Sequence, residues 1–155
     1  MISKYLSLFS SLSTSIKSGM CAPHKAIMLL TVIDMVEDGS ISNTCIEFSE
    51  KLERLFNYNW NRYIGESSVF QPKPGTPFWH LNSEPFWNLI PYEGGEETIK
   101  NLQQGNPYSA STLRQHIKYA QIDKDLFELL KDKTNRAMLR TLLIGIYLMQ
   151  MLQKL

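Results

Sequence analysis

The sequence predicts a mainly α-helical domain with a small β-hairpin, an α+β fold formed as one compact unit around a central buried helix. With 155 residues, 43% of them hydrophobic, the chain can bury one sizeable core, which favours a single domain over residues 1–155. Helical periodicity recurs in several segments, and residues 23–36 are apolar on nearly every face. Between residues 71 and 92, two aromatic pairs flank a group of turn formers.

Two helices are expected in the first part of the chain. Apolar residues recur every three or four positions from residue 2 to about residue 17, and the glycine at 19 ends this first helix. A second helix begins at Pro23 and runs to Val36. His24 and Lys25 lie on its first turn, where unpaired N–H groups and the positive end of the helix dipole suit an anion such as a phosphate.

The middle of the chain contains the predicted hairpin. A capping-box pattern over residues 44–47 starts a third helix there or nearer Phe48. Phe78-Trp79 and Phe86-Trp87 are expected to lie on the two hairpin strands, with residues 82–85 as the turn. A proline-rich segment before them is stiff and could hold a pocket in shape. The aromatic residues either fill a core or form a platform beside that pocket.

Three further helices complete the expected fold. After an exposed turn and a polar stretch, Ser109 or Ser111 caps a helix that would direct Arg114 and Lys118 outward at i and i+4. A short helix then runs from Asp123 to Leu130. The last helix, over about residues 134–153, is apolar on more than one side, so it is either central or docks on another surface.

The acidic residues are unevenly distributed although the net charge is only +1. All 15 lie outside three stretches, residues 1–33, 67–83 and 98–122, which contain all three histidines. If these stretches meet in space they form a locally positive face, whereas a chance grouping of the acids gives none. The basic and histidine side chains concerned are Lys25, Lys73, Lys100, Arg114, Lys118, His24, His80 and His116.

Several classes of protein are disfavoured. Two cysteines are too few for a disulfide framework and fit a reducing compartment, so a cytoplasmic protein is expected. Cys21 and His24 have the spacing of half a metal site, but no second Cys/His pair follows, and neither a metal nor another cofactor is predicted. No stretch approaches the ~20 apolar residues of a membrane helix.

Sequence motifs for catalysis are lacking. The chain has no glycine-rich phosphate loop, no nucleophile elbow and no HNH-type nuclease arrangement. Cys21 beside His24 would be a nucleophile with its base in a hydrolase, but a buried core cysteine is the ordinary arrangement. We therefore expect a binding domain rather than an enzyme, with any nuclease module located elsewhere.

The order of several motifs resembles one known family. Pro-His-Lys (23–25) opens an apolar helix, Thr-Pro-Phe-Trp-His-Leu (76–81) precedes Pro-Phe-Trp-Asn-Leu (85–89), and a two-helix tail follows. Over about residues 20–150 this order resembles the sulfur-binding domain of HNH-type, modification-dependent restriction endonucleases. The resemblance implies binding of double-stranded DNA whose backbone carries a phosphorothioate, in which sulfur replaces a non-bridging oxygen.

The resemblance also implies a site. In the family, sulfur sits in a shallow apolar surface cavity lined by a His-Arg pair at a helix start and a Tyr-Pro pair before Phe-Trp. The matching positions here are His24-Lys25 and Thr76-Pro77, with His80 at the next inward turn. Lysine and threonine thus replace the family's arginine and tyrosine, and the wall at Thr76 offers only a methyl group.

An apolar cavity prefers sulfur because sulfur is larger, softer and a weaker hydrogen-bond acceptor than oxygen. A phosphate oxygen pressed against the Pro77 ring would lose hydrogen bonds to water at a cost of ~1–3 kcal/mol. Basic side chains would add salt-dependent attraction to the backbone, or would form only a solvated face. The DNA-contacting residues proposed by position are Lys73, Asn106, Tyr108, Ser109, Ser111, Arg114 and Lys118.

Two other functions stay open. The same fold could read another DNA modification, which the replacements at Lys25 and Thr76 allow. Alternatively, the chain is an assembly or regulatory module of a restriction system that binds no sulfur. It would then use its apolar last helix to bind a nuclease domain or subunit, or to form a homodimer. This second alternative predicts oligomers and no affinity for DNA.

Overall fold

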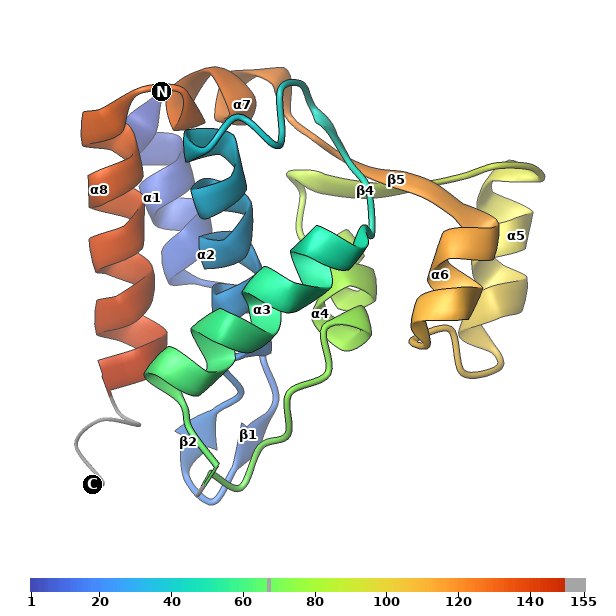
Figure 1. Ribbon diagram of the computed structural model, residues 1–155, viewed down its shortest axis with the longest axis horizontal. Helices are drawn as coiled ribbons and strands as arrows, with labels where there is room; N and C mark the ends of the chain where they lie inside the picture. The colour runs from blue at the N-terminus through green and yellow to red at the C-terminus, as the bar shows by residue number, and fades with distance from the viewer. Residues whose placement is uncertain (67, 150–155) are drawn as a thin grey trace.

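The computed structural model describes residues 1–66 and 68–149 and confirms a mainly helical α+β fold (Figure 1). A bundle contains α1 (Ile2–Ser10), α2 (His24–Glu37), α3 (Glu50–Tyr63) and α8 (Lys133–Leu143), which continues as a π-helical turn over Ile144–Leu148. α7 (Lys124–Leu130) crosses the end of this bundle (Figure 1). The last helix is thus confirmed for its described part, and its predicted end, residues 150–153, lies outside the described residues.

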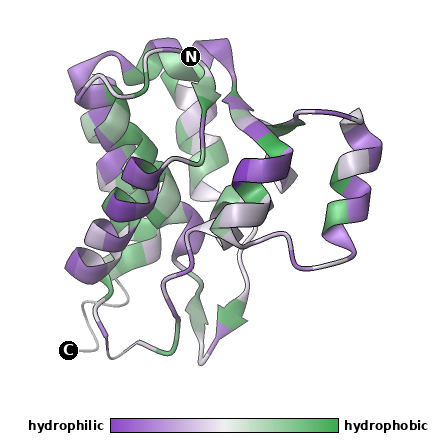
Figure 2. Cartoon of the chain, turned by 45° about the vertical axis from the view of Figure 1, so that its right-hand side comes forward, coloured by the Kyte–Doolittle hydropathy of each residue, from purple (hydrophilic) through white to green (hydrophobic). Residues whose placement is uncertain are grey.

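The second helix is the centre of the core, as its all-round apolar sequence predicts. Eleven of the 14 residues of α2 are buried, and α3, α7, α8 and α4 (Gly75–His80) all pack against it. Each fully buried Leu, Ile or Met side chain stabilises the fold by about 1.5–3 kcal/mol. Figure 2 shows the hydrophobic residues concentrated where the helices face one another.

A three-stranded antiparallel sheet lies beside the bundle, with strand order β3 (Cys45–Ile46), β5 (Ile117–Ile122), β4 (Trp87–Pro91). β5 is the central strand, so it joins two segments that are far apart in the sequence. α5 (Gly95–Gln103) and α6 (Ala110–His116) project from the far end of β4 and β5, away from the bundle (Figure 1).

The predicted hairpin over residues 71–92 is wrong. Its first half is helical, α4 followed by a 3-10 turn over Leu81–Ser83, and β4 alone is a strand. Pro74 and Pro77 lack the N–H that a strand ladder needs, but they are compatible with the first turn of a helix. β4 pairs with β5 because Ile117–Ile122 offers a complementary apolar strand.

A small hairpin does exist elsewhere. β1 (Ile16–Lys17) pairs with β2 (Met20–Cys21), and Ser18 and Gly19 form the turn with φ of 55° and 76°. The aromatic pairs of the predicted hairpin fill the core, since none of their four side chains is more than 3% exposed. The Trp87 indole Nε1–H donates to the Phe78 carbonyl at 3.0 Å, which ties α4 to β4.

Two helix boundaries in the first half differ from the prediction. α1 ends at Ser10 rather than near residue 17, because the Leu12 N–H donates to the distant Tyr147 hydroxyl at 2.9 Å and the chain turns away. α3 begins at Glu50, where the Ser49 hydroxyl accepts from the Leu52 N–H at 3.1 Å. The start nearer Phe48 is therefore correct, and the capping box at residue 44 is not used.

Later elements also differ. The segment predicted as an exposed turn and polar stretch forms α5. Ser109 caps α6 as predicted, but this helix ends at His116 and the chain continues as β5, which places Lys118 on a strand instead of one turn after Arg114. Strand pairing on both edges of β5 satisfies more backbone groups than a further helical turn would.

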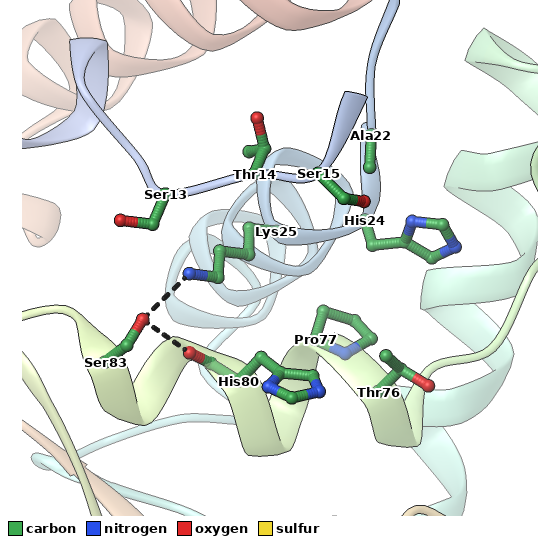
Figure 3. A pocket seen from close by; sticks show the side chains of 10 residues that line it. All are labelled: Ser13, Thr14, Ser15, Ala22, His24, Lys25, Thr76, Pro77, His80 and Ser83. Carbon is green, nitrogen blue, oxygen red and sulfur yellow. Dashed lines mark hydrogen bonds between the residues drawn. The ribbon is translucent and has the colours of Figure 1, made fainter. Parts of the chain in front are cut away.

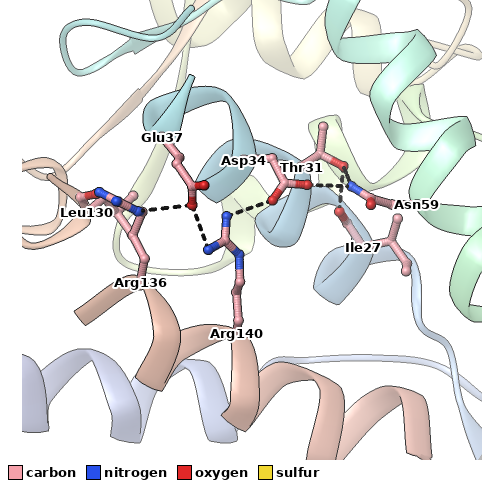
Figure 4. Close-up of polar contacts among 8 residues, drawn as sticks. All are labelled: Ile27, Thr31, Asp34, Glu37, Asn59, Leu130, Arg136 and Arg140. Atoms are coloured by element: carbon pink, nitrogen blue, oxygen red, sulfur yellow. Dashed lines mark hydrogen bonds and ion pairs between the residues drawn. The ribbon is translucent and has the colours of Figure 1, made fainter. Parts of the chain in front are cut away.

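A polar network joins α2 to α3 and α8 (Figure 4). The Asn59 amide donates to Thr31 Oγ1 at 3.2 Å and to Asp34 Oδ2 at 3.1 Å. Arg140 pairs with Asp34 and with Glu37, each at 2.8 Å. The hydrogen bond and charge of Arg140 lower the pKa of the Glu37 carboxyl.

We expect Asn59→Ala to lower the free energy of unfolding by about 1–3 kcal/mol, because the buried Thr31 hydroxyl and the partly buried Asp34 carboxylate lose the Asn59 donor. Asn57→Ala, at an exposed position of the same helix, is the matched control and should stay within about 0.5 kcal/mol of the wild type. Urea denaturation measures both. Equal effects of the two substitutions would contradict a structural role for the network.

Candidate functional site

A pocket of about 440 Å³ opens between the start of α2, one side of α4 and the segment before β1 (Figure 3). We call it the α2–α4 pocket. It brings together every residue that the sequence predicted for a sulfur cavity, from positions about 50 residues apart in the chain. The lining residues are His24, Lys25, Thr76, Pro77, His80, Ser13, Thr14, Ser15, Ala22 and Ser83.

His24 is held in one orientation on the first turn of α2. Its Nε2–H donates to the Gln71 carbonyl at 2.7 Å, and its ring lies against Trp60, with centroids 4.8 Å apart, and Phe70. Burial lowers the pKa of His24, and the nearby charge of Lys73 acts in the same direction, although the bond to Gln71 opposes them. The imidazole is therefore neutral at neutral pH.

His80 is also neutral at neutral pH. Burial lowers its pKa, and the positive charge of Lys25 lowers it further. The His80 ring lies 5.1 Å from the Tyr108 ring, centroid to centroid. Neither histidine therefore adds a positive charge to the pocket under ordinary conditions.

Lys25 is buried and paired. Its Nζ lies 2.7 Å from Glu84 Oε2 and donates to Ser83 Oγ at 3.1 Å, and the side chains of Lys25 and Glu84 are only 8% and 7% exposed. Glu84 Oε2 also accepts from the Ser13 N–H at 3.0 Å. This partner was not anticipated, since the sequence suggested that Lys25 meets a phosphate directly.

The pocket lining carries both apolar and hydroxyl groups. Pro77, the Thr76 methyl group and Ala22 supply carbon surface. Figure 3 shows Ser13, Thr14 and Ser15 along the edge opposite α4. The sequence prediction missed these three residues because it continued the first helix through them. The closely spaced serines were the available signal, since serine competes with helical hydrogen bonds.

A second, larger hollow adjoins the first and shares His24 and Thr76 with it. We call it the adjoining groove; its volume is about 710 Å³. Lys17 and Lys73 line it, and Glu53 is an acid on its wall. It also contains Asn106, Tyr108 and Ser109, which the sequence predicted as DNA-contacting residues. The groove thus adds polar and basic groups beside the α2–α4 pocket.

A family model described as ScoMcrA-like, DNA sulfur-binding domain matches residues 2–155 of the chain. The chain belongs to this family. No curated protein matches it. The resemblance seen in the order of the motifs is confirmed, and the match extends over nearly the whole chain. A DNA sulfur-binding domain is a DNA-binding module.

In this sulfur-binding domain the three acid-free stretches meet. Residues between 13 and 25 from the first stretch and between 76 and 83 from the second line the α2–α4 pocket, and Asn106 and Tyr108 from the third stretch lie on the adjoining groove. The meeting that the charge distribution suggested is therefore real. Acids still border both hollows, because Glu84 pairs with Lys25 and Glu53 lies in the groove wall.

Three predicted DNA-contacting residues of the sulfur-binding domain lie outside these hollows. Arg114 is engaged: its guanidinium pairs with Glu53 and donates from Nε to the Phe48 carbonyl at 3.0 Å. Among the described residues, Ser111 and Lys118 line neither hollow. Both are exposed, Ser111 on α6 and Lys118 on β5.

Residues 1–66 and 68–149 contain no group of three or more His, Cys, Asp and Glu side chains placed to hold a metal ion. In the same part of the chain, no helix has both the length and the apolar character needed to cross a bilayer.

Gly75 lets the loop that carries Tyr108 approach α4 closely. A Cβ at this position would lie 1.9 Å from the Tyr108 carbonyl oxygen, so a side chain would force the loop away. We expect Gly75→Ala to lower the free energy of unfolding by about 1–3 kcal/mol. Gly105→Ala is the control, because its Cβ would make only an ordinary contact, 3.9 Å from the Leu102 carbonyl oxygen. Denaturant unfolding of both variants tests this, and equal stability would contradict the close approach.

The lowered pKa of His24 predicts a pH dependence of stability. The folded protein binds fewer protons at this residue than the unfolded chain, so stability present above the ordinary histidine pKa is lost as pH falls below about 6.5. His24→Phe keeps an aromatic ring against Trp60 and removes the titration. Unfolding free energies measured between about pH 7.5 and 5.5 should fall less in His24→Phe than in the wild type. Parallel curves would contradict the assignment.

Proposed function

We propose that this domain binds double-stranded DNA carrying a phosphorothioate and that the α2–α4 pocket receives the sulfur. The observation that carries the proposal is the meeting of His24, Lys25, Thr76, Pro77 and His80 at one pocket in a member of the DNA sulfur-binding family. These residues come from two separate segments, so their convergence is a property of the fold.

The chemistry of the pocket supports sulfur over oxygen. Carbon surface from Pro77 and Ala22 gives an entering oxygen no hydrogen bond, so oxygen loses its water without replacement. Sulfur is a weaker acceptor and loses less. The two histidines have lowered pKa values and are neutral, so they do not add a charge that would favour every phosphate equally.

The adjoining groove supplies attraction to the DNA backbone in this proposal. Lys17 and Lys73 can neutralise phosphates, which gives an affinity that falls with salt. Asn106 and Tyr108 lie on the same groove and can contact base edges or sugar and phosphate groups. Lys118 on β5 and Ser111 on α6 would contribute only if the duplex extends past the groove.

The domain would serve modification-dependent restriction, with the nuclease supplied by another domain or subunit. A reader of a different DNA modification is the nearest alternative, because Thr76 gives the pocket a smaller apolar wall than the tyrosine found in the family. An assembly module is the second alternative. It is favoured by the exposure of Met138, Ile146 and Met149, each at least 41% exposed, on the α8 side.

A gel-shift titration with paired duplexes tests the proposal. The duplexes are identical except for one phosphorothioate of defined configuration, at near-physiological salt. We expect the wild type to prefer the sulfur duplex at least about tenfold, or ~1.4 kcal/mol. Pro77→Ala should reduce the preference, whereas Pro72→Ala, at an exposed proline outside both hollows, should leave it unchanged.

The other outcomes separate the alternatives. Equal weak binding of both duplexes by the wild type would overturn sulfur recognition and favour a reader of another modification. Absence of binding to either duplex would favour the assembly module. A preference that survives in Pro77→Ala would leave sulfur recognition intact and move its site away from Pro77.

A further inference from the structure

Glu84 is an unusual residue to find beside a pocket for an anion. Glu84 is the first acid after the acid-free stretch 67–83, and it is only 7% exposed. A lone carboxylate in such a position would repel a phosphate group. Its observed partner is Lys25, which is the buried cation lining the α2–α4 pocket.

The positive charge of Lys25 acts inside the pocket. It contributes to lowering the pKa of His80, which lies on the opposite element, α4. An ammonium group has three N–H donors, and Glu84 and Ser83 take two of them. The carboxylate therefore cancels the charge and also limits the hydrogen bonds that Lys25 can offer to an entering ligand.

This cancellation bears on the choice between sulfur and oxygen. In a partly desolvated pocket, an unpaired ammonium attracts any phosphate, and it favours oxygen because oxygen accepts stronger charge-assisted hydrogen bonds than sulfur. An unpaired Lys25 would thus raise the affinity for ordinary DNA more than that for the modified backbone. A paired Lys25 leaves apolar contact as the main difference between the two.

We propose that Glu84 is a specificity-determining positioning residue, whose carboxylate neutralises Lys25 and so prevents the α2–α4 pocket from accepting an unmodified phosphate. The inference rests on the proposed function of the pocket. Glu84 acts through Lys25 and not by touching the DNA. Glu84 also accepts a hydrogen bond from the Ser13 N–H, which holds the segment containing Ser13 beside the start of α2.

The geometry supports a division of labour between the two hollows. Affinity for any backbone comes from Lys17 and Lys73 in the adjoining groove, which are exposed to solvent. The α2–α4 pocket adds selectivity because its cation, unlike those two, is matched by a buried anion at 2.7 Å. Loss of the anion would convert the pocket into one more phosphate site.

Glu84→Gln is the decisive variant. The glutamine has the same shape and keeps an oxygen that can accept from the Ser13 N–H and from Lys25, but the charge of Lys25 is then uncancelled. We expect the affinity for the unmodified duplex to rise about tenfold and the affinity for the sulfur duplex to rise less, so the preference falls. The salt dependence for unmodified DNA should steepen by about one phosphate contact.

Two further variants test whether the effect passes through Lys25. Lys25→Met leaves the Glu84 carboxylate unpaired and should weaken binding of both duplexes. Lys25→Met with Glu84→Gln removes both charges and should restore binding of the sulfur duplex above that of Lys25→Met alone. If Lys25 acted only as a direct phosphate contact, the double variant would bind as weakly as Lys25→Met, and that result overturns the proposal.

Thermal unfolding of each variant separates specificity from stability. A structural role for Glu84 predicts lower stability with an unchanged ratio of the two affinities and an unchanged salt slope, and this outcome also overturns the inference. If Glu84→Gln does not fold, the double variant tests the inference instead. It removes both charges, so it must keep the wild-type preference for the sulfur duplex over the unmodified duplex. A wild type without any preference for sulfur would instead overturn the proposed function.

Discussion

The all-round burial of α2 is the constraint on which the rest of the structure depends. A helix with apolar residues on every face must be covered from several directions, and α3, α4, α7 and α8 do so. Its first turn is consequently brought against α4 and the segment before β1, which creates the α2–α4 pocket. The position of His24 and Lys25 at a surface hollow follows from this packing of the core.

The packing also gives the pocket its chemistry. Burial makes charge costly, and the ionisable groups near the pocket respond to that cost in two ways. The histidines become neutral, as their lowered pKa values show, whereas Lys25 keeps a carboxylate partner. The result is a hollow without net charge that lies next to a groove with exposed lysines. In the proposed function, such an arrangement would separate general attraction to DNA from discrimination at one atom of the backbone.

The polar network on the other side of α2 has a supporting role. Asn59 and Arg140 satisfy acceptors that α2 presents to α3 and α8. Trp60, next to Asn59 in α3, packs against the His24 ring. The network therefore holds the helix that supports one wall of the pocket, although its members line neither hollow.

Much of the candidate site was accessible from sequence because the family-like motifs have a characteristic order. His24, Lys25, Thr76, Pro77 and His80 were matched one by one, and the structure brings them together. Ser13–Ser15 and Glu84 were missed because their placement depends on contacts between residues about 60 or more positions apart, such as Leu12 with Tyr147, Ser13 with Glu84, and Glu84 with Lys25. Arg114 and Lys118 were placed on one helix because the alternation that favours β5 is weak until β3 and β4 supply partners.

The amino-acid sequence by itself determined the central helix and the class of fold, because periodicity and composition are local properties that tertiary contacts seldom reverse over 14 residues. Only the tertiary structure decided that residues 75–80 are helical, that residues 117–122 form a strand, and that Lys25 meets Glu84. Short segments have little intrinsic preference, so long-range pairing and burial select their conformation.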